Sequence, residues 1–452
     1  MRRVFKPAAT GLAMMFLLGS LLTAQAFALL GPYESWMETT NGLRQSQTYE
    51  YDPLFLNPTV ITALDIGGPM DIGSDYRWNV PVITYGFDQS FLDYFGTNGV
   101  AAVKSAIRVF NDLPPASKIV LTNFPLSVET LNYPVLALTN AWFYDLKSHT
   151  LSLLAEQLGL SQPIRYCFVI KQWDPSLMVV PNGYAYSGEY CWGSWAIPQF
   201  IVRRNFDPET LEQNSIVNDI IYTAIIWPAG STNYMLPLTT DLNATTRFSV
   251  ADFGLNIGRY YTGLSRDDVG GLRYLLSTNT IHFETLLPDV RRLAASEKLV
   301  DGAWRPGVDK ITFVEQPTDA RTGQFRTYAY RFTDHYYRPN FPGSFGGKEA
   351  LLSQPLERVV TKPDILFCVA DSGAQWPVPQ ATCTGTTNWI NNAKLNGNST
   401  SAGPGVIRPG IRIAFDKSGE TWTDWLGKSV PWQWASFDAS TNPPVFYPVS
   451  QP

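Results

Sequence analysis

The chain has 452 residues, a net charge of −5, 16% charged residues and 13% aromatic residues. No basic stripe is present to contact phosphates, so nucleic acid is excluded as an expected partner. The 33 prolines and 34 glycines predict many turns and a body rich in β-strands.

The first 26 residues have the pattern of a secretory signal peptide. Arg2, Arg3 and Lys6 are followed by an almost uncharged apolar run over 11–23, and small residues around Ala26 offer a cleavage site. An uncleaved anchor helix is the alternative, but the run is shorter than the roughly 20 residues that span a bilayer. We therefore expect a secreted, periplasmic or cell-surface protein with no membrane span in its mature chain.

One strand and three helices stand out between residues 77 and 278. RWNVPVITYGFD (77–88) predicts a strand, and the helix after it stops at Pro114 and Pro115. The second helix contains LSLLAEQLGL (151–160), which Gly159 is placed to cap, and the third lies in GLSRDDVGGLRYLLST (263–278). The expected buried positions are Val100, Val103, Ile107 and Phe110; Leu151, Leu154 and Leu158; and Val269, Leu272, Leu275 and Leu276.

Two details of the third helix make specific predictions. Ser265 and Asp268, three residues apart, form a variant of the capping box. Gly270 and Gly271 each cost a helix roughly 1 kcal/mol, so another element is expected to pack closely against them.

The remaining segments complete a predicted domain plan. Residues 27–75 are expected to form an N-terminal arm or pro-like segment, and 281–303 a linker between domains. Residues 304–452 predict short strands and a sandwich-like, β-rich C-terminal domain. Its clearest strands are KITFVEQ, RTYAYRFTD, DILFCVAD and GIRIAFDK.

The order of these motifs resembles the matrixin (metzincin) metallopeptidases. That family begins its catalytic domain with an ITYSF-like strand and a helix, and closes it on a helix announced by L-S-x-D-D-I-x-G-I. The resemblance covers 77–278 and implies an α+β, matrixin-like domain over 76–280, with a long insertion at about 161–255. The residues that match the closing motif are Leu264, Ser265, Asp267, Asp268, Val269 and Gly271.

The zinc site of that family, H-E-x-x-H-x-x-G-x-x-H, is missing. Zinc needs three histidines and an open position for water, and the Glu takes the proton from that water. Aligning on Gly159 puts Ser152, Glu156 and Gln162 at the ligand positions and Leu153 at the base. The three histidines of the chain, His149, His282 and His335, are too scattered to restore the set. We therefore expect degenerate site positions, no metal and no cofactor.

Weaker signals concern the methionine and cysteine residues. Met235, in YMLPL (234–238), matches the M-x-P of the family's Met-turn. Four cysteines in an exported chain favour two local disulfides, Cys167–Cys191 and Cys368–Cys383, among three pairings. A four-thiolate zinc site is the alternative, although C-x-x-C spacing is absent.

The sequence thus predicts a non-catalytic pseudoprotease or extracellular binding module, with an extracellular protein or a glycan as partner. One alternative is an active metallopeptidase with atypical ligands such as Glu156. Another is a hydrolase or carbohydrate-binding protein that acts through the C-terminal domain, where a tryptophan cluster resembles a sugar-stacking platform. That cluster contains Trp422, Trp425, Trp432 and Trp434.

Overall fold

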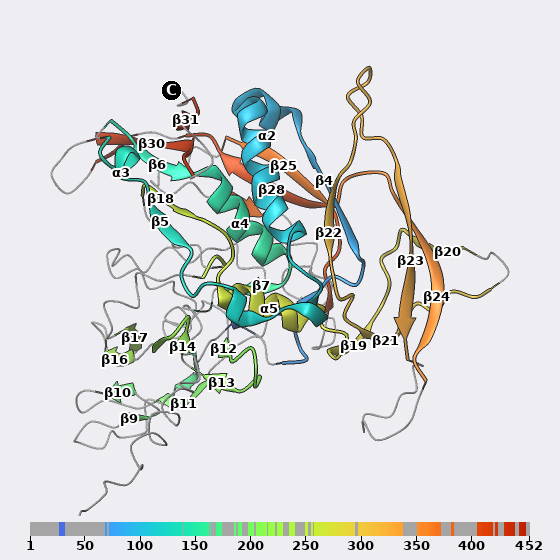
Figure 1. Ribbon diagram of the computed structural model, residues 1–452. Coiled ribbons are helices and arrows are strands. Elements are labelled where there is room, and N and C mark those ends of the chain that lie inside the picture. Colours follow the sequence, from blue (N-terminus) through green and yellow to red (C-terminus); the bar gives the residue numbers. More distant parts are fainter. Residues whose placement is uncertain are drawn as a thin grey trace, which may run out of the picture.

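A five-stranded sheet at the centre of the protein is assembled from strands far apart in the sequence. The computed structural model describes residues 27–31, 68–69, 72–138, 140–161, 257–293, 297–337, 350–371, 405–418, 429–438 and 443–448, with shorter stretches between 163 and 255 and at 381–383 and 421–423. Within them the chain is mixed α/β, with many strands and few helices (Figure 1).

The central sheet has the strand order β22-β4-β25-β28-β26. The first four strands are parallel and β26 is antiparallel at one edge. β4 is buried on both faces from its second residue onward, as expected for a parallel strand covered on both sides. The strands are β4 (Val82–Phe87), β22 (Thr312–Glu315), β25 (Ile365–Ala370), β26 (Ala381–Cys383) and β28 (Ile411–Asp416).

Two helices, α2 (Gln89–Asn111) and α4 (Leu146–Gln157), pack against each other and the sheet (Figure 1). The Asp88 side chain accepts from Ser90 N at 2.9 Å and caps the start of α2, which is kinked at Gly96, where φ is +58°. Predicted stripe residues Val103, Ile107 and Phe110 are buried. The shorter helices are α3 (Tyr133–Leu136), α5 (Arg266–Leu276) and the 3₁₀ turns η2 (Ala116–Lys118) and η3 (Leu121–Asn123).

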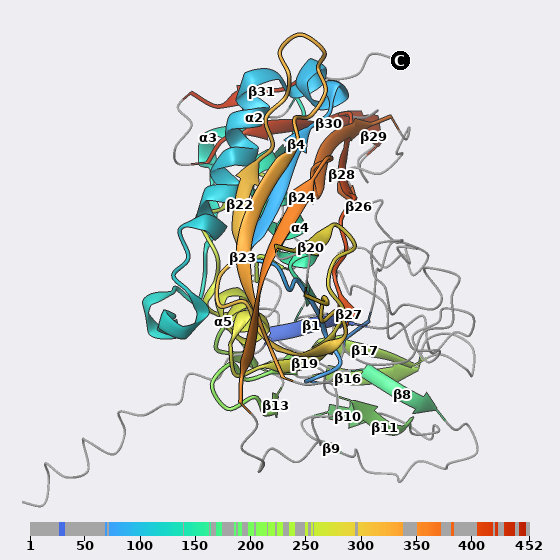
Figure 2. The ribbon, with the colours of Figure 1, turned by 90° about the vertical axis from the view of Figure 1, so that its right-hand side faces the viewer.

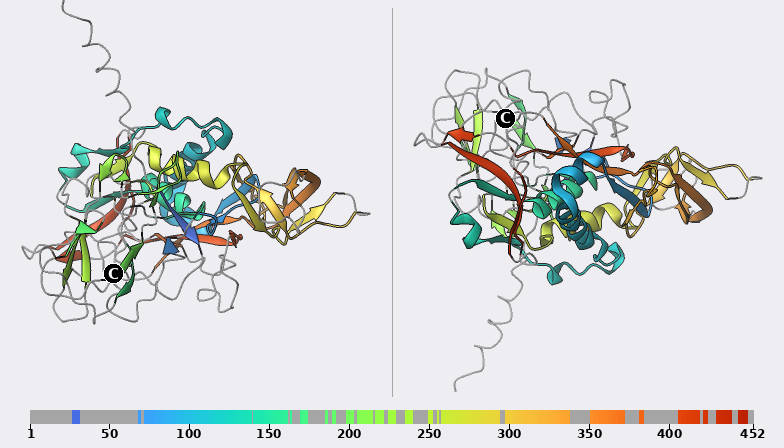
Figure 3. Two further views of the ribbon diagram at one scale, coloured as in Figure 1. Left: turned by 90° about the horizontal axis from the view of Figure 1, so that it is seen from below. Right: turned by 90° about the horizontal axis from the view of Figure 1, so that it is seen from above.

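A second, antiparallel sheet projects from this body (Figures 1 and 3). Its order is β20-β24-β23, and a two-stranded sheet of β19 and β21 adjoins it. We call the three-stranded sheet the arm. The strands are β19 (Ile281–Glu284), β20 (Val290–Arg292), β21 (Ala303–Pro306), β23 (Tyr328–Tyr336) and β24 (Leu352–Val360).

Short strands complete the rest of the described chain, and many lie below the central sheet (Figure 2). β1 (Phe27–Gly31) is buried along its whole length and pairs with three partners, so the start of the predicted N-terminal arm belongs to the core. Its partners are β2 (Gly68–Pro69), β7 (Leu160–Ser161) and β12 (Asn205–Phe206).

The other strands are β3 (Tyr76–Arg77), β5 (Glu129–Leu131), β6 (Trp142–Asp145), β8 (Val169–Trp173), β9 (Ala185–Tyr186), β10 (Glu189–Cys191), β11 (Pro198–Val202), β13 (Gln213–Asn214), β14 (Ile216–Val217), β15 (Ile220–Ile221), β16 (Ala224–Pro228), β17 (Met235–Thr239), β18 (Arg259–Tyr261), β27 (Gly405–Val406), β29 (Thr421–Thr423), β30 (Ser429–Ser436) and β31 (Val445–Phe446).

The expected division into two domains is not what the strand pairing gives. β22 and β25, from the segment expected to form a separate sandwich, flank β4 on both sides, and β30 pairs with β6. The expected linker contains strands β19 and β20. One hydrophobic core contains Ile83, Leu154 and Phe415, so residues 304–452 complete the same body. The individual strands were predicted correctly, but their partners were not, because strand period carries no information about distant pairing.

Candidate functional site

Helix α4 stands where the resemblance places an active-site helix. It begins after Asp145, whose carboxylate accepts from Ser148 N at 2.9 Å and Ser148 Oγ at 2.6 Å. It ends as predicted at Gly159, which has φ +109° and donates its N–H to Glu156 O. A Cβ on Gly159 would collide with the backbone oxygen of Tyr76, so only glycine fits there.

The four predicted degenerate positions do not come together into a site. Ser152 and Leu153 are 5% and 1% exposed, so both lie inside the core, whereas Glu156 is partly exposed. Gln162 lies outside the described residues. The helix is buried on nearly every face because α2, β6, β7, β18, β26 and β30 surround it, which corrects the single apolar stripe expected from its leucines.

These side chains do not fit a zinc ion. Leu153 offers neither a ligand atom nor a base, and Ser152 is a neutral hydroxyl in apolar surroundings. Within the described residues, no group of three His, Cys, Asp or Glu side chains is arranged to hold a metal. We therefore derive no reaction step through a metal at α4.

Helix α5 carries the closing motif, and its polar residues have structural roles. The predicted capping box is confirmed: Ser265 caps the helix and its N–H donates to Asp268 at 3.0 Å. Asp268 also accepts from Val250 N and Ala251 N, at 2.9 and 2.8 Å. Asp267 is buried beside it at 1% exposure.

The two glycines of α5 are contact points, as predicted. A Cβ on Gly271 would lie 2.6 Å from the Leu160 side chain and 3.2 Å from Phe27, so β7 and β1 pack directly on the helix. A Cβ on Gly270 would lie 2.5 Å from Pro208. Because glycine has no side chain, β1, β7 and the segment at Pro208 can approach the helix closely.

Met235 and the cysteines differ from their expected roles. Met235 begins β17, where it pairs with Pro228, so the M-x-P segment is a strand instead of a tight turn. Cys368 is a free, buried thiol whose Sγ lies 3.6 Å from Ile413 O.

The predicted Cys368–Cys383 link is therefore wrong for this structure. β28 lies between β25 and β26, and strands two apart are separated by roughly 9.6 Å, beyond the ~7 Å that a disulfide tolerates. Cys191 lies in β10, and its predicted partner Cys167 lies outside the described residues.

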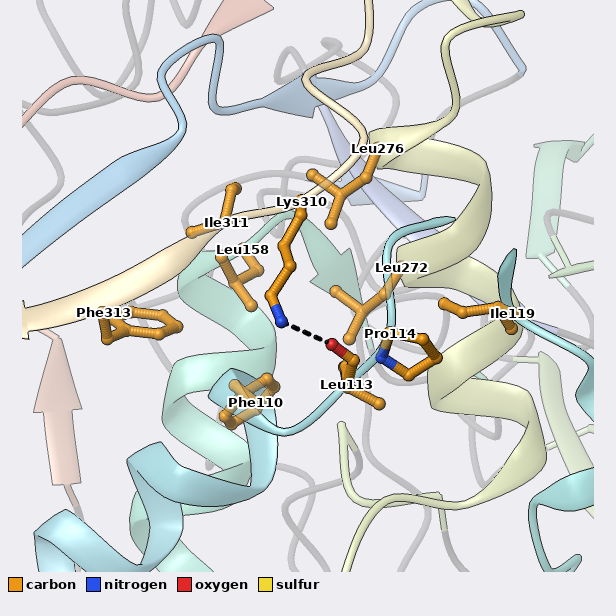
Figure 4. A pocket seen from close by; sticks show the side chains of 10 residues that line it. All are labelled: Phe110, Leu113, Pro114, Ile119, Leu158, Leu272, Leu276, Lys310, Ile311 and Phe313. Atoms are coloured by element: carbon orange, nitrogen blue, oxygen red, sulfur yellow. Dashed lines mark hydrogen bonds between the residues drawn. The ribbon is translucent and has the colours of Figure 1, made fainter. Parts of the chain in front are cut away.

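Two hollows adjoin the helices, and neither has the character of an active site. The first, where α2, α4 and α5 meet, is lined by apolar side chains and crossed by Lys310, whose Nζ donates to Leu113 O at 2.9 Å (Figure 4). Its volume of about 20 Å³ suits one water molecule at most. The second is an open groove of about 360 Å³ between Leu113, Phe124 and Leu264, and Asp112 is its only charged lining residue.

The densest group of ionisable side chains lies elsewhere, between β3, α5 and β19. Asp75, Arg77, His282 and Glu284 are each at most 2% exposed. Arg77 Nε donates to Glu284 Oε1 at 2.6 Å, and the Tyr274 hydroxyl donates to Asp75 Oδ1 at 3.1 Å. We call these five residues the buried charge cluster.

His282 lies between the two carboxylates of this cluster. Its Nε2 is 3.6 Å from Asp75 Oδ1 and its Nδ1 is 3.9 Å from Glu284 Oε1, both too long for a hydrogen bond. Among the described residues, both ring nitrogens of His282, Asp75 Oδ2 and Glu284 Oε2 have no hydrogen-bond partner. Burial raises the pKa of Asp75 to about 6 and lowers the pKa of His282 to about 3.

The cluster can exchange a proton. With Asp75 and Glu284 ionised, Arg77 charged and His282 neutral, its net charge is −1, and one added proton makes it neutral. Neither hollow described above is lined by these residues, and the contacts of the cluster join β3, α5 and β19. The cluster could not be predicted from the sequence, because isolated charges in DYRW and IHFE have the spacing of ordinary exposed strand residues.

Comparison with known proteins assigns no function to these residues. No family model, curated protein or solved structure matches the chain. No helix among the described residues is both long and apolar enough to cross a membrane.

Proposed function

We propose that this chain is an exported, non-catalytic pseudoprotease with a matrixin-like core, and that it acts as an extracellular binding module. Export follows from the signal-peptide pattern of residues 1–26, and Phe27, next to the proposed cleavage site, opens the buried strand β1. Strand β4 and helices α2, α4 and α5, the four elements on which the resemblance depends, contribute to one hydrophobic core. That arrangement supports the fold part of the proposal.

One observation carries the functional part: α4 has the position and the glycine cap of an active-site helix without its chemistry. Zinc hydrolysis needs ligand side chains and room for water on one face of the helix. Here the corresponding face presents Ser152 and Leu153 to the core, and Glu156 is the one carboxylate among the described positions. A single carboxylate provides neither a ligand set nor a separate base.

The carbohydrate-binding alternative loses its main support. Trp432 and Trp434 are 1% and 0% exposed, and Trp434 Nε1 donates to Asp416 O at 2.7 Å, so both rings belong to the core. The side chains of Trp422 and Trp425 lie outside the described residues. Buried rings leave no face on which a sugar can stack.

Metal content tests the proposal. Mature protein prepared with excess zinc and then dialysed should retain well under one zinc per chain, and a strong chelator should leave its melting temperature unchanged. A broad panel of fluorogenic peptides should remain uncleaved. Stoichiometric zinc whose removal lowers the melting temperature, or cleavage that Glu156→Ala abolishes, would make the chain a metallopeptidase with atypical ligands.

A further inference from the structure

The outer strand of the arm, β23, has one paired side and one open side. Its residues pair with β24 without interruption, from Tyr328 opposite Val360 to Tyr336 opposite Leu352. On the other side, the described residues provide one backbone contact, from Tyr337 N to Trp304 O at 2.8 Å. In that register Pro306 stands opposite His335, and because proline has no N–H, the pairing with β21 ends there.

The direction of the free backbone groups follows from this contact. Backbone groups alternate in direction along a strand, so the residues that share the direction of Tyr337 also point away from β24. Their side chains are all exposed, and no described residue hydrogen-bonds to their outward N–H and C=O groups. These residues are Ala329, Arg331, Thr333 and His335.

The edge of the central sheet formed by β22, in contrast, is covered by a side chain. The Asn111 side chain donates to Phe313 O at 2.9 Å and accepts from Phe313 N at 2.7 Å, and so occupies the outer side of β22 as a strand would. Exposed strand edges invite pairing with other chains, and folded proteins usually cover them. Among the described residues, β23 has no such cover.

The two faces beside this edge differ in chemistry. On the outer face, Arg331 is 72% exposed and only weakly held, with Nε 3.4 Å from Glu357 Oε1. Glu357 is held more closely by Arg291, at 3.0 and 2.6 Å, which leaves Arg331 available to another carboxylate. On the inner face, Tyr328, Tyr330 and Phe332 form a half-buried ladder with ring centroids 6.1 and 5.7 Å apart.

We propose that the open edge of β23 binds an extended segment of a partner protein in which acidic residues alternate with β-branched apolar residues. The segment adds a strand to the arm through the outward backbone groups of β23. Its acidic side chains lie beside Arg331 and His335, and its apolar side chains cover the edge of the Tyr328–Tyr330–Phe332 ladder. The inference deepens the proposed binding function and depends on it.

Charge also favours a partner over a second copy of this chain. Antiparallel self-pairing of β23 would place the Arg331 side chains of two copies on the same face of the joined sheet, and like charges on facing strands are destabilising. An acidic segment replaces that repulsion with attraction. Arg331 therefore disfavours self-association while it selects the partner.

The test uses a blocked synthetic octapeptide that alternates Glu with Val, and the full mature chain. Two control peptides have Lys in place of Glu, or the same composition with the alternation scrambled. We expect the alternating peptide to bind at least tenfold more tightly than either control, as measured by calorimetry or by fluorescence polarisation of a labelled copy. Equal binding of all three peptides, or no binding, would overturn the inference.

Variants of the edge locate the contact. Arg331→Glu and Thr333→Pro, which removes an outward N–H without touching the β24 pairing, should each weaken binding at least tenfold. The matched controls are Arg321→Glu, the same charge change in the exposed hairpin turn, and Thr333→Ala, which keeps the N–H; both should bind within threefold of wild type. Melting temperatures of all four should be close to wild type.

Two further results separate the inference from the proposed function. A concentration-dependent dimer that Thr333→Pro dissociates would show that the edge pairs with itself, and would overturn the partner. Cleavage of the bound peptide, detected by mass spectrometry, would contradict the non-catalytic function while leaving the docking edge in place. Failure to bind, with no zinc and no cleavage, would overturn only the docking edge.

Discussion

Helices α4 and α5 belong to the same core, and both carry motif positions of the matrixin resemblance, but they differ in what those positions do. In α5 the polar residues Ser265 and Asp268 cap the helix and tie it to a neighbouring loop. In α4 the corresponding positions are occupied by residues such as Ser152 and Leu153, which fill space in the core. The cap at Gly159 is formed all the same.

This difference separates two kinds of motif. Capping residues satisfy backbone groups that every helix leaves unpaired at its ends, so their contribution to stability does not depend on any chemistry at the site. Ligand and base residues contribute only through the reaction they support. A chain can therefore keep the capping residues and lack the ligand and base residues. Resemblance to a fold does not by itself establish the activity of that fold.

The largest expected effect tests the caps of α5. Asp268→Ala removes the acceptor of three buried backbone N–H groups, those of Val250, Ala251 and Ser265. At about 1–3 kcal/mol for each unsatisfied donor, the free energy of unfolding should fall by about 4 kcal/mol or more. Ser265→Ala, which loses the cap and a long hydrogen bond from Asn218 Nδ2 at 3.3 Å, should cost less, about 1–2 kcal/mol. Urea unfolding of both variants measures the difference, and a loss below 1 kcal/mol for Asp268→Ala would contradict the role assigned to it.

The next effect tests whether α4 is structural. Leu154 is 0% exposed, so Leu154→Ala should lower the free energy of unfolding by about 2–5 kcal/mol. Glu156→Ala, at a partly exposed position that the resemblance aligns with a zinc ligand, should change it by less than about 0.5 kcal/mol. Thermal unfolding beside a peptide-cleavage assay gives both readouts. The reverse ranking, with Glu156 essential and Leu154 tolerant, would point to a working active site.

The elements that could be predicted from the sequence are those with local causes. Strand β4, helices α2, α4 and α5, the Gly159 cap and the Ser265 capping box each follow from spacing or from end residues within about 25 positions. The partners of β4 could not be predicted, because β22 and β25 come from more than 200 residues downstream. Pairing between strands joined by such long loops produces no periodic pattern in the sequence from which it could be predicted.

The candidate sites were less predictable than the fold. The positions on α4 that the resemblance aligns with zinc ligands were numbered from Gly159. The helix was expected to have one buried stripe, and its burial on nearly all sides depends on strands such as β30 and β26. The buried charge cluster depends on Asp75 and His282, which are 207 positions apart in the sequence and meet only because β3 and β19 are adjacent to α5. The residues that flank Asp75 and His282 in the sequence do not indicate that either side chain is buried.

The smallest expected effect concerns the pH dependence of this cluster, and the two residues act in opposite directions. Burial lowers the pKa of His282 from 6.5 to about 3, so as pH falls the unfolded chain takes up the proton first. The stabilisation from a neutral His282 is full above pH 6.5 and is lost towards pH 3. Burial raises the pKa of Asp75 from 3.8 to about 6, so its stabilisation is full below pH 3.8 and is lost as pH rises through 6.

Between pH 7 and pH 5 the two contributions therefore nearly cancel in the wild type, and single variants should expose them. Relative to wild type, His282→Asn should gain about 2 kcal/mol of stability when the pH is lowered from 7 to 5, because its unfolded state no longer takes up that proton. Asp75→Asn should lose about 1 kcal/mol over the same interval. Urea unfolding at the two pH values measures each slope, and the effects of other buried titratable groups, such as Asp145, His149 and Asp268, are common to all variants. Slopes of the same sign in the His282 and Asp75 variants would show that the cluster does not exchange its proton in this way.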